Sequence, residues 1–208
     1  SHYDGQGWTT YRQLGQLEGS YVFSILVDDT HTAWFGTDSG IASNDGRDWM
    51  TITTAPEPCR SAVFDVAQVM TGGYLFACDV VAVFFDGSTW ISYNEFSGRL
   101  ISDIFVHPDG SWWITTANGV YSFDGDSWTH HSAANGLPEN NIHTLAVDSN
   151  GFVWVSSCDG VSRFTGAGWQ TDPQPAELAG CIGKLEFTSQ GTAWAISDHG
   201  LLHYDGFS

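Results

Sequence analysis

One motif recurs along the whole chain at a nearly constant spacing. The pattern Asp-Gly-x-x-Trp, in one copy decayed, ends at five tryptophans: Trp8, Trp49, Trp90, Trp128 and Trp169. Successive members lie 41, 41, 38 and 41 residues apart. A second series, in short apolar segments, keeps the same period: Trp34, Leu75, Trp113, Trp154 and Trp194. A third series follows it: Gly40, Val81, Gly119, Gly160 and Gly200. Three series in register indicate an array of repeated supersecondary units.

Each period contains four predicted β-strands. The first is an apolar run, Val22–Val27 in the first period. The second strand carries the Trp34 series, the third begins at the Gly40 series, and the fourth begins at the tryptophan of the motif. Asx-Gly pairs such as Asp109-Gly110 lie between these strands. They are a strong hairpin signal, because both central residues of the tight turn adopt positive φ. Four short strands in about 40 residues are typical of a β-propeller blade.

The repeats predict an all-β fold, a five-bladed β-propeller of four-stranded antiparallel blades. We expect a single domain over residues 1–208, with these repeats: 12–52, 53–93, 94–131, 132–172, and 173–208 together with 1–11. The sequence begins in the phase of a fourth strand, Trp8–Tyr11, and ends in a third strand near Tyr204. We therefore expect the N-terminal strand to complete the last blade and close the ring, because this pairing covers two strand edges. The alternative is a segment of a longer array.

One repeat carries a more specific signature. Gly136-Leu-Pro-Glu-Asn-Asn-Ile142, followed by Leu145–Asp148 and Gly151–Trp154, resembles the two-component regulator propeller repeat. The other repeats keep the tryptophan, glycine and Asp-Gly-x-x-Trp positions but lose the Gly-Leu-Pro segment. The resemblance implies a propeller, and an extracytoplasmic sensor region that recognises ligands, often glycans. Related repeats form the streptogramin lyases, so the resemblance does not decide between binding and catalysis.

The charge balance narrows the class of partner. The chain contains six Lys and Arg residues and 24 Asp and Glu residues, which give a formal net charge of −18. This charge disfavours nucleic acids and anionic membranes, which bind through Lys and Arg. It favours cations, cationic partners or neutral ligands, unless the acidic residues serve solubility alone. No apolar run approaches the about 20 residues of a membrane span. No signal peptide is visible, and we expect a monomer.

The four cysteines, at 59, 78, 158 and 181, lack the Cys-x-x-Cys spacing of structural zinc sites. Cys59 precedes the first strand of the second repeat and Cys78 ends its second strand, so the two meet at one end of an antiparallel pair. Cys158 ends the second strand of the fourth repeat, and Cys181 lies on the link that crosses the same end. We therefore predict the disulfides Cys59–Cys78 and Cys158–Cys181, and an extracytoplasmic location, periplasmic or secreted. Four buried thiols are the alternative.

Two sets of polar residues are candidates for binding. The turns between second and third strands share one face of the fold, here called the loop-rich face, with the links that lead into each first strand. An Asp or Asn recurs in these turns: Asp38, Asp79, Asn118, Asp159 and Asp198. These residues either stabilise the turns or supply oxygen ligands to a neutral sugar or Ca²⁺. A second set occupies one position of the first strands: Ser24, Asp65, Asp103, Thr144 and Lys184. It forms either a polar floor for a ligand or an internally satisfied ring in which Lys184 pairs with an Asp.

The aromatic and histidine residues complete the prediction. Tryptophans at the same place in every repeat indicate core between blades, whereas Trp112 breaks the repeat and is expected on the opposite, exposed strand face. His143 and His199 are the weak catalytic candidates, and no hydrolase, metalloprotease or nucleotide-binding motif is present. We predict a binding or sensing module for a glycan, a small neutral or cationic ligand, or a protein. No cofactor is expected, with Ca²⁺ as a possible exception. A metal-assisted lyase or hydrolase, and a structural repeat segment without a ligand, are the alternatives.

Overall fold

A computed structural model describes residues 1–11, 13–14, 17–18, 21–96, 100–172 and 180–204. The chain divides into two compact units: unit 1 comprises residues 1–68 and 72–93, and unit 2 comprises residues 69–71 and 94–208. The main boundary coincides with the predicted end of the second repeat. The two units are described separately, and the single domain stays a prediction.

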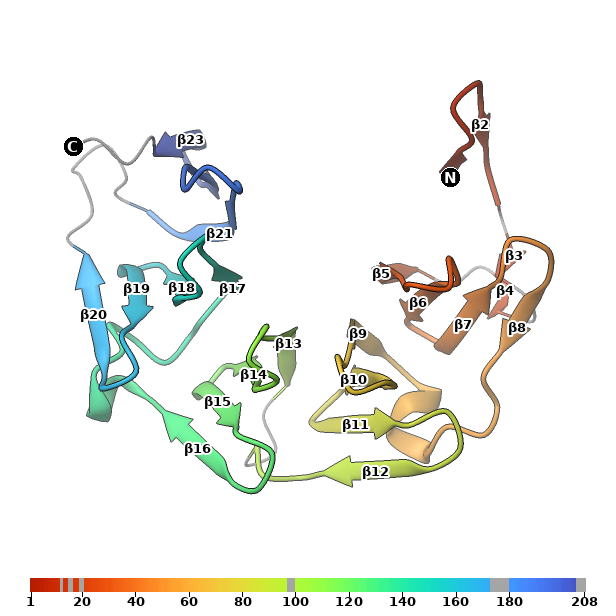
Figure 1. The fold of residues 1–208 in the computed structure, drawn as a ribbon, viewed down its shortest axis with the longest axis horizontal. Coiled ribbons are helices and arrows are strands. Elements are labelled where there is room, and N and C mark those ends of the chain that lie inside the picture. Colours follow the sequence, from red (N-terminus) through yellow and green to blue (C-terminus); the bar gives the residue numbers. More distant parts are fainter. Residues whose placement is uncertain (12, 15–16, 19–20, 97–99, 173–179, 205–208) are drawn as a thin grey trace. The chain divides into compact units, whose positions relative to one another are not determined.

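Unit 1 contains two four-stranded sheets. The first sheet has the order β5 (Val22–Val27), β6 (Ala33–Thr37), β7 (Gly40–Asn44) and β8 (Trp49–Thr51). The second has the order β9 (Val63–Gln68), β10 (Tyr74–Cys78), β11 (Val81–Phe85) and β12 (Trp90–Tyr93), and is preceded by the 3₁₀ helix η1 (Glu57–Arg60). The first strands β5 and β9 lie side by side (Figure 1). Short strands also pair near the N-terminus: β1 (His2–Tyr3) with β2 (Trp8–Thr9), and β3 (Gln13–Leu14) with β4 (Leu17–Glu18).

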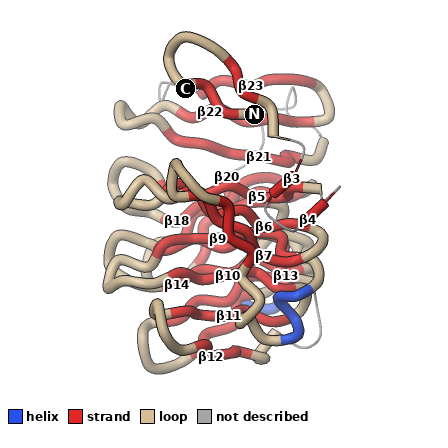
Figure 2. Tube along the Cα trace, turned by 90° about the vertical axis from the view of Figure 1, so that its right-hand side faces the viewer, coloured by secondary structure: helices blue, strands red, loops and turns tan. Residues whose placement is uncertain are grey.

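Unit 2 contains three sheets of the same kind. The third sheet consists of β13 (Ile101–Val106), β14 (Trp112–Thr116), β15 (Gly119–Phe123) and β16 (Trp128–His131). The fourth, which follows the 3₁₀ helix η2 (Ala133–Asn135), consists of β17 (Thr144–Val147), β18 (Val153–Ser157), β19 (Gly160–Phe164) and β20 (Trp169–Asp172). The fifth consists of β21 (Ile182–Phe187), β22 (Ala193–Ser197) and β23 (Gly200–Tyr204). The first strands β13, β17 and β21 pack in sequence order. Figure 2 shows how little of the chain is helical.

The Asp-Gly turns are built as the sequence predicts. Asp45, Asp86 and Asp124 each accept, at Oδ1, hydrogen bonds from the two backbone N–H groups two and three residues further on. These hydrogen bonds hold the pKa of each carboxyl below its ordinary value. Asp4 makes the same turn near the N-terminus, between β1 and β2.

That N-terminal turn gives β2 a local partner. The Asp4 turn places Tyr3 opposite Trp8, so β2 pairs with β1. A hairpin partner a few residues away costs less chain entropy than a distant one. The fifth sheet has three strands in the described residues, and its completion by Trp8–Tyr11 stays a prediction.

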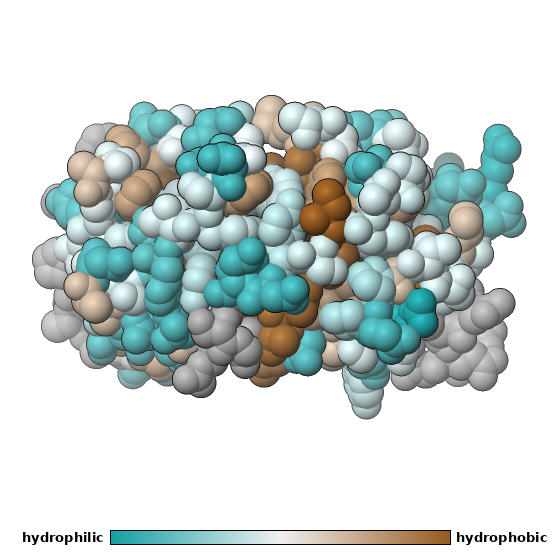
Figure 3. Space-filling model, turned by 90° about the horizontal axis from the view of Figure 1, so that it is seen from below, coloured by the Kyte–Doolittle hydropathy of each residue, from teal (hydrophilic) through white to brown (hydrophobic). Residues whose placement is uncertain are grey.

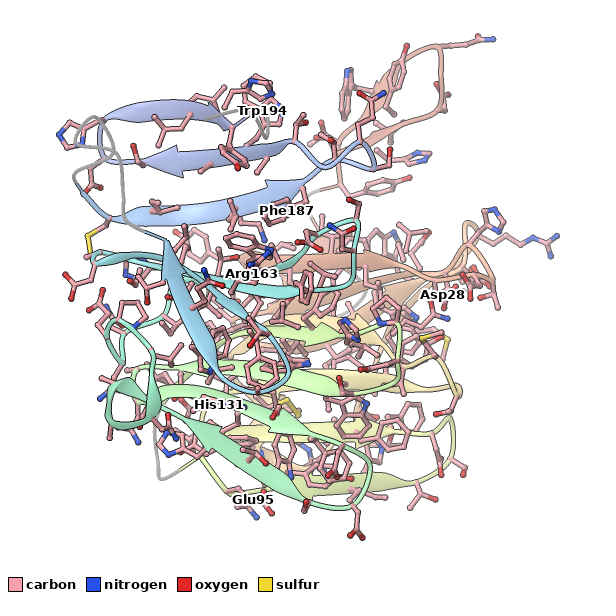
Figure 4. The ribbon with its side chains drawn as sticks, turned by 60° about the vertical axis from the view of Figure 1, so that its left-hand side comes forward. Asp28, Glu95, His131, Arg163, Phe187 and Trp194 are labelled. Atoms are coloured by element: carbon pink, nitrogen blue, oxygen red, sulfur yellow. A yellow bond between two sulfur atoms is a disulfide. The ribbon has the colours of Figure 1, made fainter. Side chains whose placement is uncertain are left out.

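Tryptophans form the core between successive sheets of each unit. Trp34 is 8% exposed and packs on Tyr74 of the next sheet, with ring centroids 4.3 Å apart. In unit 2, Trp113 packs on Phe164, and Trp154 on Phe187. Trp194, which has no following sheet among the described residues, is 43% exposed (Figure 4). The tryptophan core is thus confirmed where a following sheet is present.

Trp112 corrects another expectation. It is 7% exposed rather than solvent-facing. Its ring packs against Phe123, its partner in the register of β14 and β15, with centroids 5.0 Å apart. Alternation does send Trp112 to the other face of the strand, but an aromatic partner covers it there.

A buried carboxylate joins the two sheets of unit 1. Asp28, 5% exposed, lies in the turn between β5 and β6. Its Oδ2 accepts hydrogen bonds from Trp34 Nε1 at 2.9 Å and from the Tyr74 hydroxyl at 2.6 Å. Asp148 repeats the first of these contacts in the fourth sheet, accepting from Trp154 Nε1 at 2.9 Å. The same aspartate therefore orders a turn and fixes the orientation of a core tryptophan.

Candidate functional site

Most turns between second and third strands contain a Ser or Thr hydroxyl that is hydrogen-bonded to the backbone of the turn. In four sheets a Ser or Thr three residues before the start of the third strand donates a hydrogen bond to the carbonyl of the turn glycine. The same hydroxyl oxygen accepts a hydrogen bond from the N–H two residues further on. These residues are Thr37, Thr116, Ser157 and Ser197. The glycines have φ of 112–124°, a conformation that side chains other than glycine rarely adopt. These hydroxyls were not predicted from the sequence, although a Ser or Thr three residues before the glycine is their signal.

The carboxylates of these turns are held by backbone groups of the incoming links. Asp38 Oδ1 accepts from the N–H of Tyr21 at 3.1 Å, and Asp198 Oδ2 accepts from the N–H of Cys181 at 3.1 Å. In the fourth sheet the roles reverse, since Glu139 of the link accepts from the N–H groups of Cys158 and Asp159. The structural role of these side chains is therefore shown by their contacts, and their oxygens also lie at the loop-rich face of each unit.

The remaining two turns differ. Asp79 is exposed and has φ of 59°, in a turn that lacks the glycine. Asn118 donates its N–H to Thr116, and its carbonyl oxygen lies 2.8 Å from His130 Nε2. The five positions thus share a location in their sheets but not one set of contacts.

Both disulfides form as predicted. Cys59 bonds to Cys78, and Cys158 bonds to Cys181. Each disulfide joins the end of a second strand to the link that leads into a first strand. It therefore restrains that link at the loop-rich face of its unit. Cys59 and Cys78 are both fully buried, whereas Cys158 and Cys181 are partly exposed.

The polar position of the first strands lies beside a bulge. The register of the first and second strands shifts immediately before Ser24, Asp103 and Lys184. In unit 2, Asp103 Oδ2 accepts from the Thr144 hydroxyl at 3.1 Å and from the N–H of Leu145 at 2.9 Å. The structure therefore brings Asp103 and Thr144 together. Lys184 instead lies 3.4 Å from Glu186 on its own strand, and its side chain is 49% exposed.

In unit 1 the same position makes different contacts. Asp65 Oδ1 accepts from the N–H of Val66, and the buried Ser24 hydroxyl has no hydrogen-bond partner among the described residues. The two residues are therefore not joined as Asp103 and Thr144 are.

The two histidine candidates are engaged in local contacts. His143 Nδ1 lies 3.1 Å from the carbonyl oxygen of Ile182, and its Nε2 lies 3.3 Å from Asn141 Nδ2. His199 lies in the turn after Ser197, and its ring would meet a side chain added at Gly180. Within the described ranges, no three His, Cys, Asp or Glu side chains are grouped so that they could hold a metal ion.

A shallow hollow lies on the opposite side of unit 2, between the third and fourth sheets. Its volume is about 240 Å³, and Trp113, Phe152 and Phe164 contribute apolar walls. His107 lies at its rim, with Nδ1 2.8 Å from Asp109 Oδ1 and Nε2 2.8 Å from the carbonyl oxygen of Gly151. This hollow was not predicted from the sequence, because His107 replaces the aspartate seen at Asp28 and Asp148 and no sequence pattern indicates a cavity.

One side of the surface is largely hydrophilic. The side of the molecule shown in Figure 3 carries mostly hydrophilic and intermediate residues, with one narrow hydrophobic strip. Among the residues described, no helix is long and apolar enough to cross a membrane.

Solved structures show the same fold. The extracellular domain of the putative hybrid two component system BT3049 from B. thetaiotaomicron matches 99% of this chain with a TM-score of 0.84 and 18% identity. This chain covers 30% of that domain. The extracellular domain of BT4673 from the same organism matches 93% of the chain with a TM-score of 0.79 and 19% identity, and 28% of that domain is covered. The chain therefore spans under a third of the length of these domains, and its resemblance to two-component regulator propeller repeats is confirmed.

Other matches have different roles. YCF48 bound to D1 peptide matches 96% of the chain, with a TM-score of 0.70 and 19% identity, over 68% of its own length. Virginiamycin B lyase from Staphylococcus aureus matches 88%, with a TM-score of 0.69 and 14% identity, over 69% of its own length. At these identities the likeness shows the fold alone. A search of curated proteins found no significant match. The profile of one family matches residues 1–205, and on that evidence the chain belongs to the photosynthesis system II assembly factor YCF48 family.

Proposed function

We propose that the chain is a binding module that takes a positively charged polypeptide segment at the loop-rich face of unit 2, in an extracytoplasmic compartment. The observation that carries the proposal is the fixed orientation of carboxylates at that face. Backbone N–H groups hold Asp198 and Glu139 in place, so these side chains lose little conformational entropy when a ligand binds.

The charge balance supports a cationic ligand. Among the described residues, the ion pairs of Lys or Arg with carboxylates are Arg60–Glu57 and Lys184–Glu186, each within a single element. Against a net charge of −18, they leave an excess of negative charge. Complementary charge speeds association and selects among partners. YCF48 is a propeller bound to a peptide, and its likeness in fold favours a polypeptide over a glycan as the ligand.

We further propose that the five sheets are blades of one propeller. Support comes from the repeated packing of first strands within each unit and from Ile25 and Val27, which are 62% and 61% exposed on the first sheet. The corresponding residues of the fourth sheet, Leu145 and Val147, pack against the sheet before it. A crystal structure that shows a different number of blades would overturn this part of the proposal.

Peptide titration tests the binding proposal. Fluorescence anisotropy with labelled peptides of equal length, one rich in Lys and Arg and one rich in Glu, should show binding of the basic peptide only. Affinity should fall as salt rises, because exposed charges are screened. The double variant Asp159→Asn, Asp198→Asn should weaken binding several-fold.

The matched control is Asp126→Asn. Asp126 is exposed in a turn between third and fourth strands, at the other end of the sheet, so the substitution removes one charge without touching the loop-rich face. Equal binding of both peptides, or an Asp126→Asn effect as large as that of the double variant, would refute the proposal. If the protein binds neutral glycans on an array but does not bind the basic peptide, the ligand is a glycan and the proposed polypeptide ligand is wrong.

A further inference from the structure

The two disulfides differ in their surroundings. Cys59 and Cys78 are 0% exposed and belong to the apolar core of unit 1, together with Val63 and Phe76. Cys158 and Cys181 are partly exposed at the loop-rich face of unit 2. A thiol reagent in solution can therefore approach the second bond while the first is shielded.

A histidine lies beside the exposed bond. His143 Nε2 is 3.9 Å from Cys158 Sγ. The other ring nitrogen, Nδ1, faces the carbonyl oxygen of Ile182 at 3.1 Å. A carbonyl only accepts hydrogen bonds, so the Nδ1 proton is fixed there and Nε2 is the nitrogen that exchanges a proton. Asn141 Nδ2, at 3.3 Å from Nε2, holds the ring from the other side.

We propose that Cys158–Cys181 is a thiol–disulfide exchange site, with His143 as its acid–base residue and a small dithiol as its co-reactant. One thiolate of the dithiol attacks Cys181 Sγ and forms a mixed disulfide. The Cys158–Cys181 bond breaks, its electron pair passes to Cys158 Sγ, and the imidazolium form of His143 gives that sulfur the Nε2 proton. The second thiol of the dithiol then loses its proton to solvent and, as a thiolate, attacks the mixed disulfide, which releases Cys181 as a thiolate and the dithiol as its cyclic disulfide. The two electrons come from the dithiol.

The attack is directed at Cys181 because its partner is the better leaving group. A developing thiolate leaves faster when a proton donor or positive charge is next to it, and His143 is beside Cys158. Reduction removes the covalent tie between the end of β18 and the residue before β21, and leaves the N–H of Cys181 held by Asp198. The reduction rates are measured without any peptide, so the two proposals fail separately.

The experiment follows both bonds in one native protein. Samples treated with dithiothreitol are quenched with N-ethylmaleimide at intervals, and peptide mapping gives the rate of alkylation at each cysteine pair. Cys158 and Cys181 should be reduced at least about 10-fold faster than Cys59 and Cys78. Equal rates, or faster reduction of the buried pair, would overturn the proposal without the need for any variant.

A variant tests the role of the histidine. His143→Asn keeps a donor toward the Ile182 carbonyl but removes the acid–base group, so it should slow reduction of Cys158–Cys181 several-fold and leave the rate of Cys59–Cys78 unchanged. The matched control is His31→Asn, the same replacement in an exposed turn of unit 1 where φ of 66° suits asparagine. If His143→Asn melts below the parent protein, His143→Gln replaces it. An unchanged rate in a folded His143 variant contradicts the acid–base role.

Discussion

Replacing Asp28 by asparagine should destabilise unit 1 far more than its single-atom change suggests. In the parent protein Oδ1 accepts from the N–H groups of Thr30 and Thr32, and Oδ2 accepts from Trp34 and Tyr74. An amide can keep the first pair, but its nitrogen then faces the indole N–H of Trp34, so a buried donor is left without an acceptor.

The expected loss follows from these contacts. An unsatisfied buried donor costs about 1–3 kcal/mol, and the bond from Tyr74 to a charged acceptor contributes about 1.5–3 kcal/mol. We expect Asp28→Asn to lower the free energy of unfolding by about 3–5 kcal/mol. Tyr74→Phe removes only this hydrogen bond and leaves the carboxylate satisfied by its other donors, so it should cost about 1.5–3 kcal/mol.

The same carboxylate predicts a pH dependence. Burial alone would raise the pKa of Asp28, but hydrogen bonds from Thr30, Tyr74 and Trp34 lower it well below its ordinary value. Burial, with the bond to Asp28, in turn raises the pKa of Tyr74 to about 12. Because the folded pKa of Asp28 is depressed, its contribution is complete above the unfolded pKa of about 3.9 and is lost as pH falls further.

Urea unfolding followed by tryptophan fluorescence measures these effects. The double variant with Tyr74→Phe gives the coupling energy of the pair. The parent should lose stability below about pH 4 more steeply than Asp28→Asn, because only the parent has this carboxylate to protonate. A loss under 1 kcal/mol on substitution, or identical acid profiles, would refute the reasoning.

Three further predictions concern other parts of the chain. Burial lowers the pKa of His131 to about 4 from 6.5, so the folded state takes up this proton later than the unfolded state, and unit 2 should lose up to about 3 kcal/mol as pH falls from 6.5 to 4. His131→Phe should flatten that part of the profile in pH-dependent urea titrations, and an unchanged slope would contradict the assignment. Gly119→Ala should destabilise the protein by several kcal/mol, because its Cβ would collide with the carbonyl oxygen of His131. The control Gly125→Ala, also at positive φ but in open space, should cost about 1 kcal/mol in the same assay. Replacing both Cys59 and Cys78 by serine should cost about 3 kcal/mol or more in thermal unfolding; a parent-like melting curve would show that the bond contributes little.

The sequence predicted the local structure well because its signals are local. Asx-Gly turns and apolar runs mark each strand, and strand order alone brought Cys59 to Cys78 and Cys158 to Cys181. The hairpin of β1 and β2 was not predicted, because the phase of the repeats carries no signal for a local hairpin, and the Asp4 turn supplies one.

The candidate site was predicted less completely, because its contacts depend on side-chain direction. Asp103 and Thr144 do meet, but the ion pair of Lys184 with Glu186 depends on rotamers that the sequence does not encode. The turn hydroxyls were missed because their partners are backbone atoms, which carry no residue-type signal.

The turn between β10 and β11 has a consequence for how such repeats diverge. Where the other sheets have a hydroxyl and a glycine, this turn has Cys78 and Val81, and its shape is kept by a bond to Cys59 and by Asp79 at φ of 59°. At this turn the Cys59–Cys78 disulfide stands where the other sheets have the hydroxyl and the glycine. Repeats can therefore exchange their signature residues one restraint at a time while the backbone of the turn persists.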